Sequence, residues 1–164
     1  MFLRHRKVAF TDGVIDLVPI ELYPPERELR FGRVLDYSIR PHGNWREAGR
    51  LSLRLGESPA LYYFGHIGYH VDPPYRGRHY AQLACRLAMP LLWQSGKHTA
   101  VITTDPDNLP SRKTAEALGA VLERTVSVPE WLCRGYGISR VKCRYIWRTE
   151  GAEARTGADA REMR

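Results

Sequence analysis

Apolar and polar residues follow two periodicities along the chain, and each segment between turn-forming residues keeps to one of them. Runs rich in β-branched and aromatic residues, bounded by turn formers, are typical of strands. Residues 80–92 instead repeat Ala and Leu at three- and four-residue steps, which predicts an amphipathic helix that begins near Tyr80. A second helix is expected over residues 110–118, with Gly119 as its stop. The expected strands cover residues 14–18, 34–40, 50–55, 61–71, 99–104, 121–128 and 141–148.

The order of these elements predicts a mixed α/β domain, in which an antiparallel meander is followed by a parallel crossover. The polar turn PHGNWREAG between the second and third strands predicts a hairpin. Pro90 lies inside the first expected helix and is expected to kink it or end it early. Residues 131–138, WLCRGYGI, are expected to form a loop. We expect one domain over residues 1–148 and a disordered tail over residues 149–164, which have almost nothing to bury.

Composition limits the partners of this domain. The chain has 164 residues, of which 43% are hydrophobic, and its formal charge of +7 with a pI near 9.6 favours polyanionic partners. Nucleic acid, a membrane surface and a phosphate-bearing ligand all have this chemistry. The apolar runs are shorter than the roughly 20 residues of a membrane span, and the start lacks a signal peptide's apolar core, so a cytoplasmic protein without a membrane partner is expected. The three cysteines lack CxxC spacing, which predicts reduced cysteines and no metal site.

The segment VDPPYRGRHYA, residues 71–81, joins an expected strand to the first helix. A helix start leaves backbone N–H groups without intrahelical partners and carries a partial positive charge, so it attracts anions. Arg76 and Arg78 strengthen that field, and Gly77 allows the backbone to approach a ligand closely. The segment predicts a phosphate cradle, with a solvated basic turn as the alternative.

Two segments together resemble the GNAT family, the Gcn5-related N-acetyltransferases. The residues that carry the resemblance are Val71, Arg76, Gly77, Arg78 and Ala81, followed 27 residues later by Asn108, Ser111 and the Leu118-Gly119 stop. It covers residues 65–120 well and the rest by the order of elements. The resemblance implies the GNAT fold, a mixed and mostly antiparallel sheet of about six to seven strands flanked by helices. Residues 19–32 are too few for the two helices that the family usually places there, so a shortened first helical region is expected.

The resemblance also implies acetyl-CoA as cosubstrate. Loop N–H groups would hold its pyrophosphate, and the backbone of the preceding strand would bind the pantetheine arm. His79 departs from the family pattern, which places glycine there, while Asn108 has a plain helix cap as its alternative role. The implied cofactor-binding residues are Tyr69, Val71, Arg76, Gly77, Arg78, His79, Tyr80, Ala81, Asn108 and Ser111.

Candidates for proton transfer are less well defined. Family members often carry, seven residues after the asparagine, a tyrosine that protonates the CoA thiolate, but this chain has Ala115 there. Tyr136, Tyr145 or water would have to replace it. His66 and His70 lie on the strand beside the implied acyl site, and imidazole titrates near working pH, so both are candidate general bases. Packed or surface histidines, with proton loss through water, are the alternative.

These observations predict an acetyl-CoA-dependent N-acetyltransferase that transfers an acetyl group directly, in a ternary complex, to a primary amine of a small molecule or peptide. Residues 131–138 or a second copy in a homodimer would complete the acceptor cleft, which aromatic residues could line: Tyr23, Tyr62, Tyr63 and Trp131. Ala115 suggests a non-catalytic acyl-CoA-binding domain as the alternative. A basic nucleic-acid-binding protein is a further, weaker alternative, since residues 131–148 mix basic and aromatic side chains.

Overall fold

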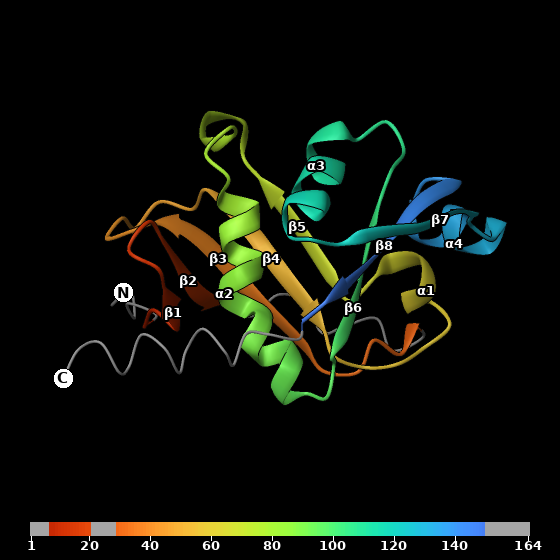
Figure 1. The fold of residues 1–164 in the computed structure, drawn as a ribbon, viewed down its shortest axis with the longest axis horizontal. Coiled ribbons are helices and arrows are strands. Elements are labelled where there is room, and N and C mark those ends of the chain that lie inside the picture. Colours follow the sequence, from red (N-terminus) through yellow and green to blue (C-terminus); the bar gives the residue numbers. More distant parts are fainter. Residues whose placement is uncertain (1–6, 21–28, 150–164) are drawn as a thin grey trace.

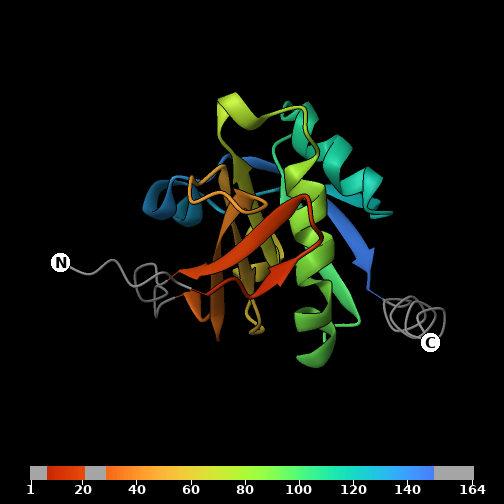
Figure 2. The same cartoon turned by 90° about the vertical axis from the view of Figure 1, so that its left-hand side faces the viewer.

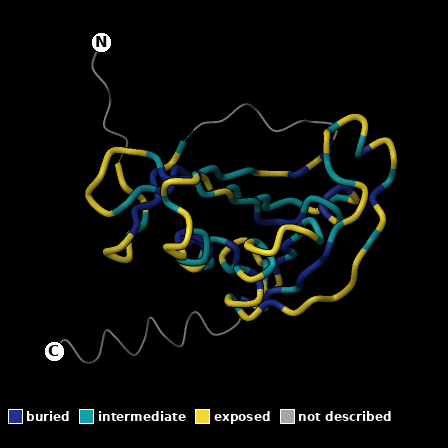
Figure 3. Tube along the Cα trace, turned by 90° about the horizontal axis from the view of Figure 1, so that it is seen from above, coloured by how far each residue is buried: buried dark blue, intermediate teal, exposed yellow. Residues whose placement is uncertain are grey.

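One sheet runs through the described chain and carries helices on both of its faces (Figures 1 and 2). The structure is a computed structural model, and it describes residues 7–20 and 29–149. The buried stretches gather along the strands in the middle of the molecule, and exposed stretches lie in the turns at its rim (Figure 3). The mixed α/β architecture expected from the sequence is confirmed.

The sheet has eight strands in the order β1-β2-β3-β4-β5-β6-β8-β7. Neighbouring strands pair antiparallel, except that β5 and β6 run parallel, as the expected meander and crossover require. The expected hairpin is the β3–β4 pair. The strands are β1 (Phe10–Thr11), β2 (Ile15–Ile20), β3 (Val34–Pro41), β4 (Gly49–Arg54), β5 (Ile67–Val71), β6 (Thr99–Thr104), β7 (Val121–Ser127) and β8 (Val141–Arg148).

Helix α2 crosses one face of the sheet, beginning at Tyr80 as predicted. Of the two effects expected of Pro90, a kink or an early end, the early end is wrong, because the helix continues to Gln94. Leu92 follows the proline and is fully buried against the sheet, so packing outweighs the one backbone hydrogen bond that a proline removes. The helices are α1 (Leu61–Phe64), the 3-10 turn η2 (Pro73–Tyr75), α2 (Tyr80–Gln94), α3 (Leu109–Ala117) and α4 (Glu130–Tyr136).

Alternation along the middle strands decides which side chains face α2. Leu51 on β4 pairs with Tyr69 on β5, and Leu53 pairs with Ile67. These four residues join the main core, to which α2 contributes small and aliphatic side chains such as Ala88. Because successive strand residues point to opposite faces, the intervening side chains of β4 and β5 face away from α2.

A second, smaller core lies around α1 and α4 on the other face of the sheet. The buried members of this second core are Leu29, Phe31, Ala60, Leu61, Val128 and Leu132.

No helix in residues 7–20 and 29–149 combines the length and apolar character needed to cross a bilayer.

This second core explains two wrong predictions. Residues 61–64 were expected to begin a strand but form the single turn of α1, in which Leu61 is buried in the smaller core. Residues 131–138 were expected to form a loop, but most of them belong to α4. Leu132 buries its side chain there, and Gly137, with φ of +66°, ends the helix.

The end of the described chain is anchored. Thr149, which the sequence places at the start of a polar tail, is fully buried. Its N–H donates to the carbonyl of His98, and its hydroxyl donates to the carbonyl of Lys97 at 2.8 Å. The rest of the expected tail and residues 21–28, where the shortened helical region was expected, lie outside the described residues.

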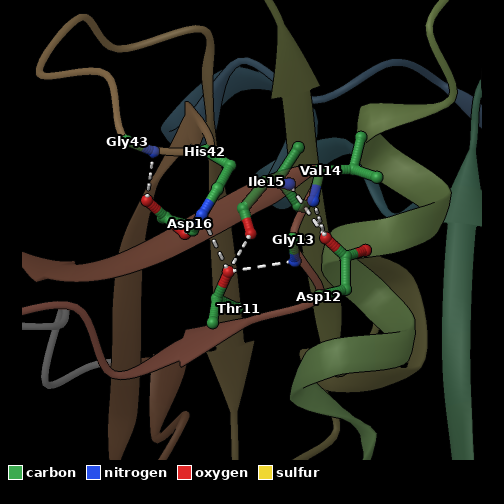
Figure 4. A network of polar contacts seen from close by, with 8 residues as sticks. All are labelled: Thr11, Asp12, Gly13, Val14, Ile15, Asp16, His42 and Gly43. Atoms are coloured by element: carbon green, nitrogen blue, oxygen red, sulfur yellow. Dashed lines mark hydrogen bonds and ion pairs between the residues drawn. The ribbon is translucent and has the colours of Figure 1, made fainter.

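A polar network joins the β1–β2 turn to the turn after β3 (Figure 4). Asp16 is buried, and its carboxylate is 2.8 Å from Nδ1 of His42 and accepts the N–H of Gly43 at 2.9 Å. The hydroxyl of Thr11 lies 3.2 Å from the same ring nitrogen. Asp12 accepts two backbone N–H groups within its own turn. The network fixes two turns that are far apart in the sequence.

Candidate functional site

Strands β5 and β6 separate soon after they meet. Their pairing is limited to Ile67 and Ile102, whereas β4–β5 and β6–β8 pair along most of their length. A cavity of about 190 Å³ lies where the two strands part. It is lined by Arg54, Tyr63, Phe64, Ile67, Gly68, Tyr69, Thr103, Thr104, Asp105, Asn108, Ser111, Ile138 and Lys142.

This cavity is lined from both faces of the sheet. Ile67 and Tyr69 point to the α2 side, where they join the main core. Gly68 lies between them in sequence and faces the other side, and a Cβ built there would meet the guanidinium of Arg54. Residues from both faces of the sheet therefore contribute to one cavity.

The loop after β5 prepares the α2 face for an anion. Arg76 donates from Nε to the carbonyl of Val71 at 3.0 Å, which holds the loop against the end of the strand. Gly77 has φ of +77°, and His79 has φ of +60°, so both lie in the left-handed region. His79 stands where the family pattern has glycine, and its left-handed backbone is one that glycine adopts without strain.

The first turn of α2 lacks a side-chain cap for its backbone N–H groups. His79 precedes the helix and makes no side-chain cap, and the first turn contains no acidic residue. Helix N-termini with unpaired N–H groups favour negative charge, and Arg76 and Arg78 are exposed beside them. Such a local field favours an anionic ligand.

Across the cavity from the loop, α3 is tied to β5. Asn108 accepts the N–H of Ser111 at 3.2 Å, so it does act as a helix cap. The hydroxyl of Tyr69 donates to the carbonyl of Ser111 at 3.2 Å, and burial raises the pKa of this phenol. The first of these bonds caps α3, and the second joins the start of α3 to β5. Asn108, Ser111 and Tyr69 all line it.

The face away from α2 carries charged side chains that the sequence analysis did not assign to the site. Lys142 donates to Asp105 at 2.5 Å, and the hydroxyl of Ser139 donates to the same carboxylate oxygen. Burial raises the pKa of Asp105, but these two hydrogen bonds outweigh it, so the pKa lies below its usual value. Asp105 is therefore an anion in the cavity wall and can attract a cationic amine.

His66, the first candidate base, is not part of this cavity. It precedes β5, and its Nδ1 accepts the N–H of Val101 at 3.0 Å. In the neutral ring the proton is therefore on Nε2, which lies 3.8 Å from Glu57 and makes no hydrogen bond to a described residue. Burial lowers the pKa of His66, although the charge of Glu57 opposes this. Its place outside the cavity argues against the role of base.

The other proton-transfer candidates also lie outside the cavity. His70 is exposed on β5, with its Nε2 3.6 Å from Asp72. Tyr136 packs on α4 at 6.2 Å from the ring of Phe64. The fully buried hydroxyl of Tyr145 donates to Glu116. Ala115 is also fully buried, so the position of the missing tyrosine is filled by the main core.

The aromatic residues expected to line an acceptor cleft divide into two groups. Tyr63 lines the cavity, together with Ile138 from the segment expected to cover the acceptor side. Tyr62 and Trp131 are exposed and do not line it. Tyr23 lies outside the described residues.

The basic and aromatic residues of β8 are partly engaged within the protein. Arg144 is buried, bonds Glu123 at 2.8 Å and lies 3.7 Å from the centre of the Tyr62 ring. Lys142 is occupied by Asp105. Side chains held in this way are less suited to neutralise the phosphates of a nucleic acid.

The comparisons with known proteins now decide the family. Residues 14–121 match the family described as "Acetyltransferase (GNAT) domain", a range that covers more than half of the chain. The chain belongs to the GNAT acetyltransferase family. The resemblance drawn from the loop and the Asn108 segment is confirmed, and with it the expected fold class, since solved GNAT structures share the fold. No curated protein sequence matches the chain.

Several solved acetyltransferases share the GNAT fold with this chain. RimJ of Mycobacterium smegmatis, solved with CoA-disulfide, is 19% identical with a TM-score of 0.60, and the match covers 94% of this chain and 93% of that one. The microcin C7 self-immunity acetyltransferase MccE, solved with acetyl-CoA and AMP, is 24% identical with a TM-score of 0.54 over 70% of this chain.

A third GNAT structure comes from Salmonella typhimurium and is described as modifying the N-terminal serine of the 50S ribosomal protein L7/L12. It is 23% identical with a TM-score of 0.54, and the match covers 71% of this chain and 64% of that one. The chain spans 61% of MccE and 64% of the ribosomal-protein-S5-alanine acetyltransferase from Vibrio fischeri, less than two thirds of each.

Proposed function

We propose that this protein is an acetyl-CoA-dependent N-acetyltransferase that acetylates a primary amine by direct transfer in a ternary complex. The observation that carries the proposal is the cavity at the parting of β5 and β6, which residues from both faces of the sheet line and which has a basic loop beyond the end of β5. A peptide or protein N-terminus is the acceptor class favoured by the relatives, since one of them is described as modifying an N-terminal serine. A small-molecule amine is the alternative.

The residues of the α2 face fit the cosubstrate. Arg76, Arg78 and the uncapped N–H groups at the start of α2 supply donors and positive charge for the pyrophosphate. Tyr69 and Asn108 line the gap between β5 and α3, which suits an extended arm. Acetyl-CoA supplies an acyl thioester, whose carbonyl carbon is the electrophile.

The chain's own groups would manage the protons of the transfer. The amine nitrogen bonds to the acyl carbon, the C–S bond breaks, the nitrogen gives up a proton, and the thiolate takes one up. Asp105 lies on the face of the sheet away from α2, which we call the acceptor face. It holds the incoming ammonium there, where water can carry its proton away. On the other face Ser111 lines the cavity and has a hydroxyl, while the buried Ala115 offers no donor.

Charge reversal in the loop tests the cosubstrate assignment. Arg76→Glu should weaken acetyl-CoA binding by at least about 10-fold in isothermal titration, because it removes a charge-assisted contact and adds repulsion. The matched control is Arg134→Glu, an equal charge change on α4 at a side chain that is 80% exposed. Unchanged affinity in a folded Arg76→Glu protein would refute the loop assignment. Acetyl-CoA binding without acetylation of any amine in a peptide and small-molecule panel would favour the non-catalytic alternative.

A further inference from the structure

Arg54 brings an uncompensated positive charge to the acceptor face of the cavity. It lies at the end of β4, is partly buried and lines the cavity. Its Nη1 donates to the carbonyls of Phe64 and Gly65, at 3.4 and 3.2 Å. None of the carboxylates in residues 7–20 and 29–149 forms an ion pair with it.

Two neighbours hold this guanidinium in place. It lies over the ring of Phe31, with Cζ 5.2 Å from the ring centre. On its other side is Gly68, where an added Cβ would be 3.1 Å from Nη2 and 3.3 Å from Nη1. The absence of a side chain at Gly68 therefore leaves the space that the guanidinium occupies.

Burying a cation without a counter-charge is costly, because the protein replaces only part of the lost hydration. Burial lowers the pKa of Arg54, and the charge of Asp36 acts against this from beyond ion-pair distance. Among the described residues, the fully buried side-chain polar atom without a hydrogen-bond partner is His66 Nε2. No nitrogen of Arg54 is in that state, so those without a partner are not completely buried. The Arg54 nitrogens without a partner in the described chain therefore keep some contact with solvent, on a side chain that lines the cavity.

Among the charged side chains that line the cavity, Arg54 is the one whose charge is not paired with an opposite charge. Lys142 is neutralised by Asp105, which it contacts at 2.5 Å. One ionic pair and one further cation therefore line the same cavity. An acceptor that brings both an ammonium and a carboxylate would match this pattern, with the carboxylate toward Arg54 and the ammonium toward Oδ2 of Asp105, since Lys142 and Ser139 both bond Oδ1.

We propose that Arg54 selects amine acceptors that carry a carboxylate close to the reacting nitrogen. This inference rests on the proposed acetyltransferase function and names the substrate class of that site. The cavity of about 190 Å³ is small, so the carboxylate must be within a few bonds of the amine. Such a group is the α-carboxylate of a free amino acid or the side chain of an N-terminal Asp or Glu in a peptide.

Pairs of acceptors that differ in one carboxylate test the inference and separate its two sources. Glycine and glycinamide form one pair, and the peptide amides Asp-Ala-Ala and Asn-Ala-Ala form the other. In one of the two pairs, wild-type protein should have a higher kcat/KM for the acceptor with the carboxylate than for its amide counterpart. The pair in which this occurs identifies the source of the carboxylate. Arg54→Met should reduce that preference by about 10- to 100-fold, the range of a lost charge-assisted hydrogen bond. Comparing each ratio with that of the wild type cancels the different reactivities of the amines.

The matched control is Arg50→Met, because Arg50 lies on the same strand and the same face but is exposed, paired with Glu47 and outside the cavity. It should keep the wild-type ratio. Gly68→Ala provides a second variant that displaces the guanidinium without removing it, and it should reduce the preference by a smaller factor. Thermal unfolding and acetyl-CoA titration of each variant verify that the fold and the cosubstrate site are retained.

The outcomes separate the two proposals. Acetylation of both members of each pair at equal efficiency, or an unchanged ratio in Arg54→Met and Gly68→Ala, overturns the role of Arg54 while the acetyltransferase function stands. Wild-type protein that neither binds nor consumes acetyl-CoA overturns both. A preference that falls in Arg54→Met and persists in Arg50→Met supports the assignment.

Discussion

At the scale of single residues, His79 shows why the family pattern has a glycine at this position: the backbone there is left-handed. The family pattern led to an expected glycine, and the structure gives His79 φ of +60°, in the region that glycine adopts without strain. The sequence showed the departure but could not show the conformation. Histidine is tolerated there because left-handed backbone costs it on the order of 1–2 kcal/mol, a fraction of the stability of a domain.

Substitutions at His79 should follow this backbone requirement. His79→Gly should leave the free energy of unfolding within about 1 kcal/mol of wild type, because relief of strain offsets the added freedom of the unfolded chain. His79→Val should lower it by about 1–2 kcal/mol, since a β-branched residue fits the left-handed region poorly. Urea denaturation of the three proteins gives these values. Equal stability of the Gly and Val variants would contradict the argument.

At the same scale, the missed site residues show the limit of sequence reasoning. Arg54, Asp105 and Lys142 come from β4, the end of β6 and β8, and the order of strands brings them together. Alternation with Leu51 and Leu53 could have placed Arg54 on one face of its strand, but no local pattern shows which strands become neighbours. The proposed cofactor loop could be predicted from the sequence because its residues are contiguous.

At the scale of elements, α4 was missed although its signals were present. Pro129 precedes the helix, Glu130 is in its first turn, Arg134 is in its last, and Gly137 follows it. The two internal or flanking glycines suggested a loop instead. For α1 no comparable signal exists, since a single turn rich in aromatic residues resembles a strand until its packing is known.

The network between the β1–β2 and β3–β4 turns should make stability depend on pH. Burial raises the pKa of Asp16, but hydrogen bonds to His42, Thr11 and the Gly43 N–H outweigh it, so the folded pKa is lowered. A lowered carboxyl pKa stabilises the fold above the unfolded pKa of about 3.9 and loses this effect as the pH falls through the folded value. Asp16→Asn should therefore cost about 1–3 kcal/mol at pH 7 and progressively less below about pH 4.

Asp12→Asn is the control for this prediction. Asp12 lies in the same turn and accepts two backbone N–H groups at 2.8 Å, which an amide oxygen can also accept. Its cost should be much smaller than that of Asp16→Asn. Chemical denaturation across the pH range measures both. A loss in Asp16→Asn that stays constant down to pH 2 would rule out the ionised carboxylate as the source.

At the scale of the whole molecule, the cysteines report on the integrity of both cores. All three are free thiols, and burial raises the pKa of Cys85 to about 12. Cys143 is buried in the main core, and Cys133 is partly exposed beside the smaller core. In native protein an aromatic disulfide reagent should modify Cys133 first and the other two at the rate of unfolding.

The time course of thiol release with and without denaturant measures this difference. Cys133→Ser should remove the fast phase and leave the slow one. Rapid reaction of all three thiols in native protein would show that the main core opens far more readily than its packing implies.

The parting of β5 and β6 also bears on how the two reactants of the proposed reaction could be told apart by mutation. The side chains that line the cavity come from both faces of the sheet, so the groups proposed for the cosubstrate and those proposed for the amine are different residues. A substitution on one face should therefore change the KM of one reactant and leave that of the other close to wild type.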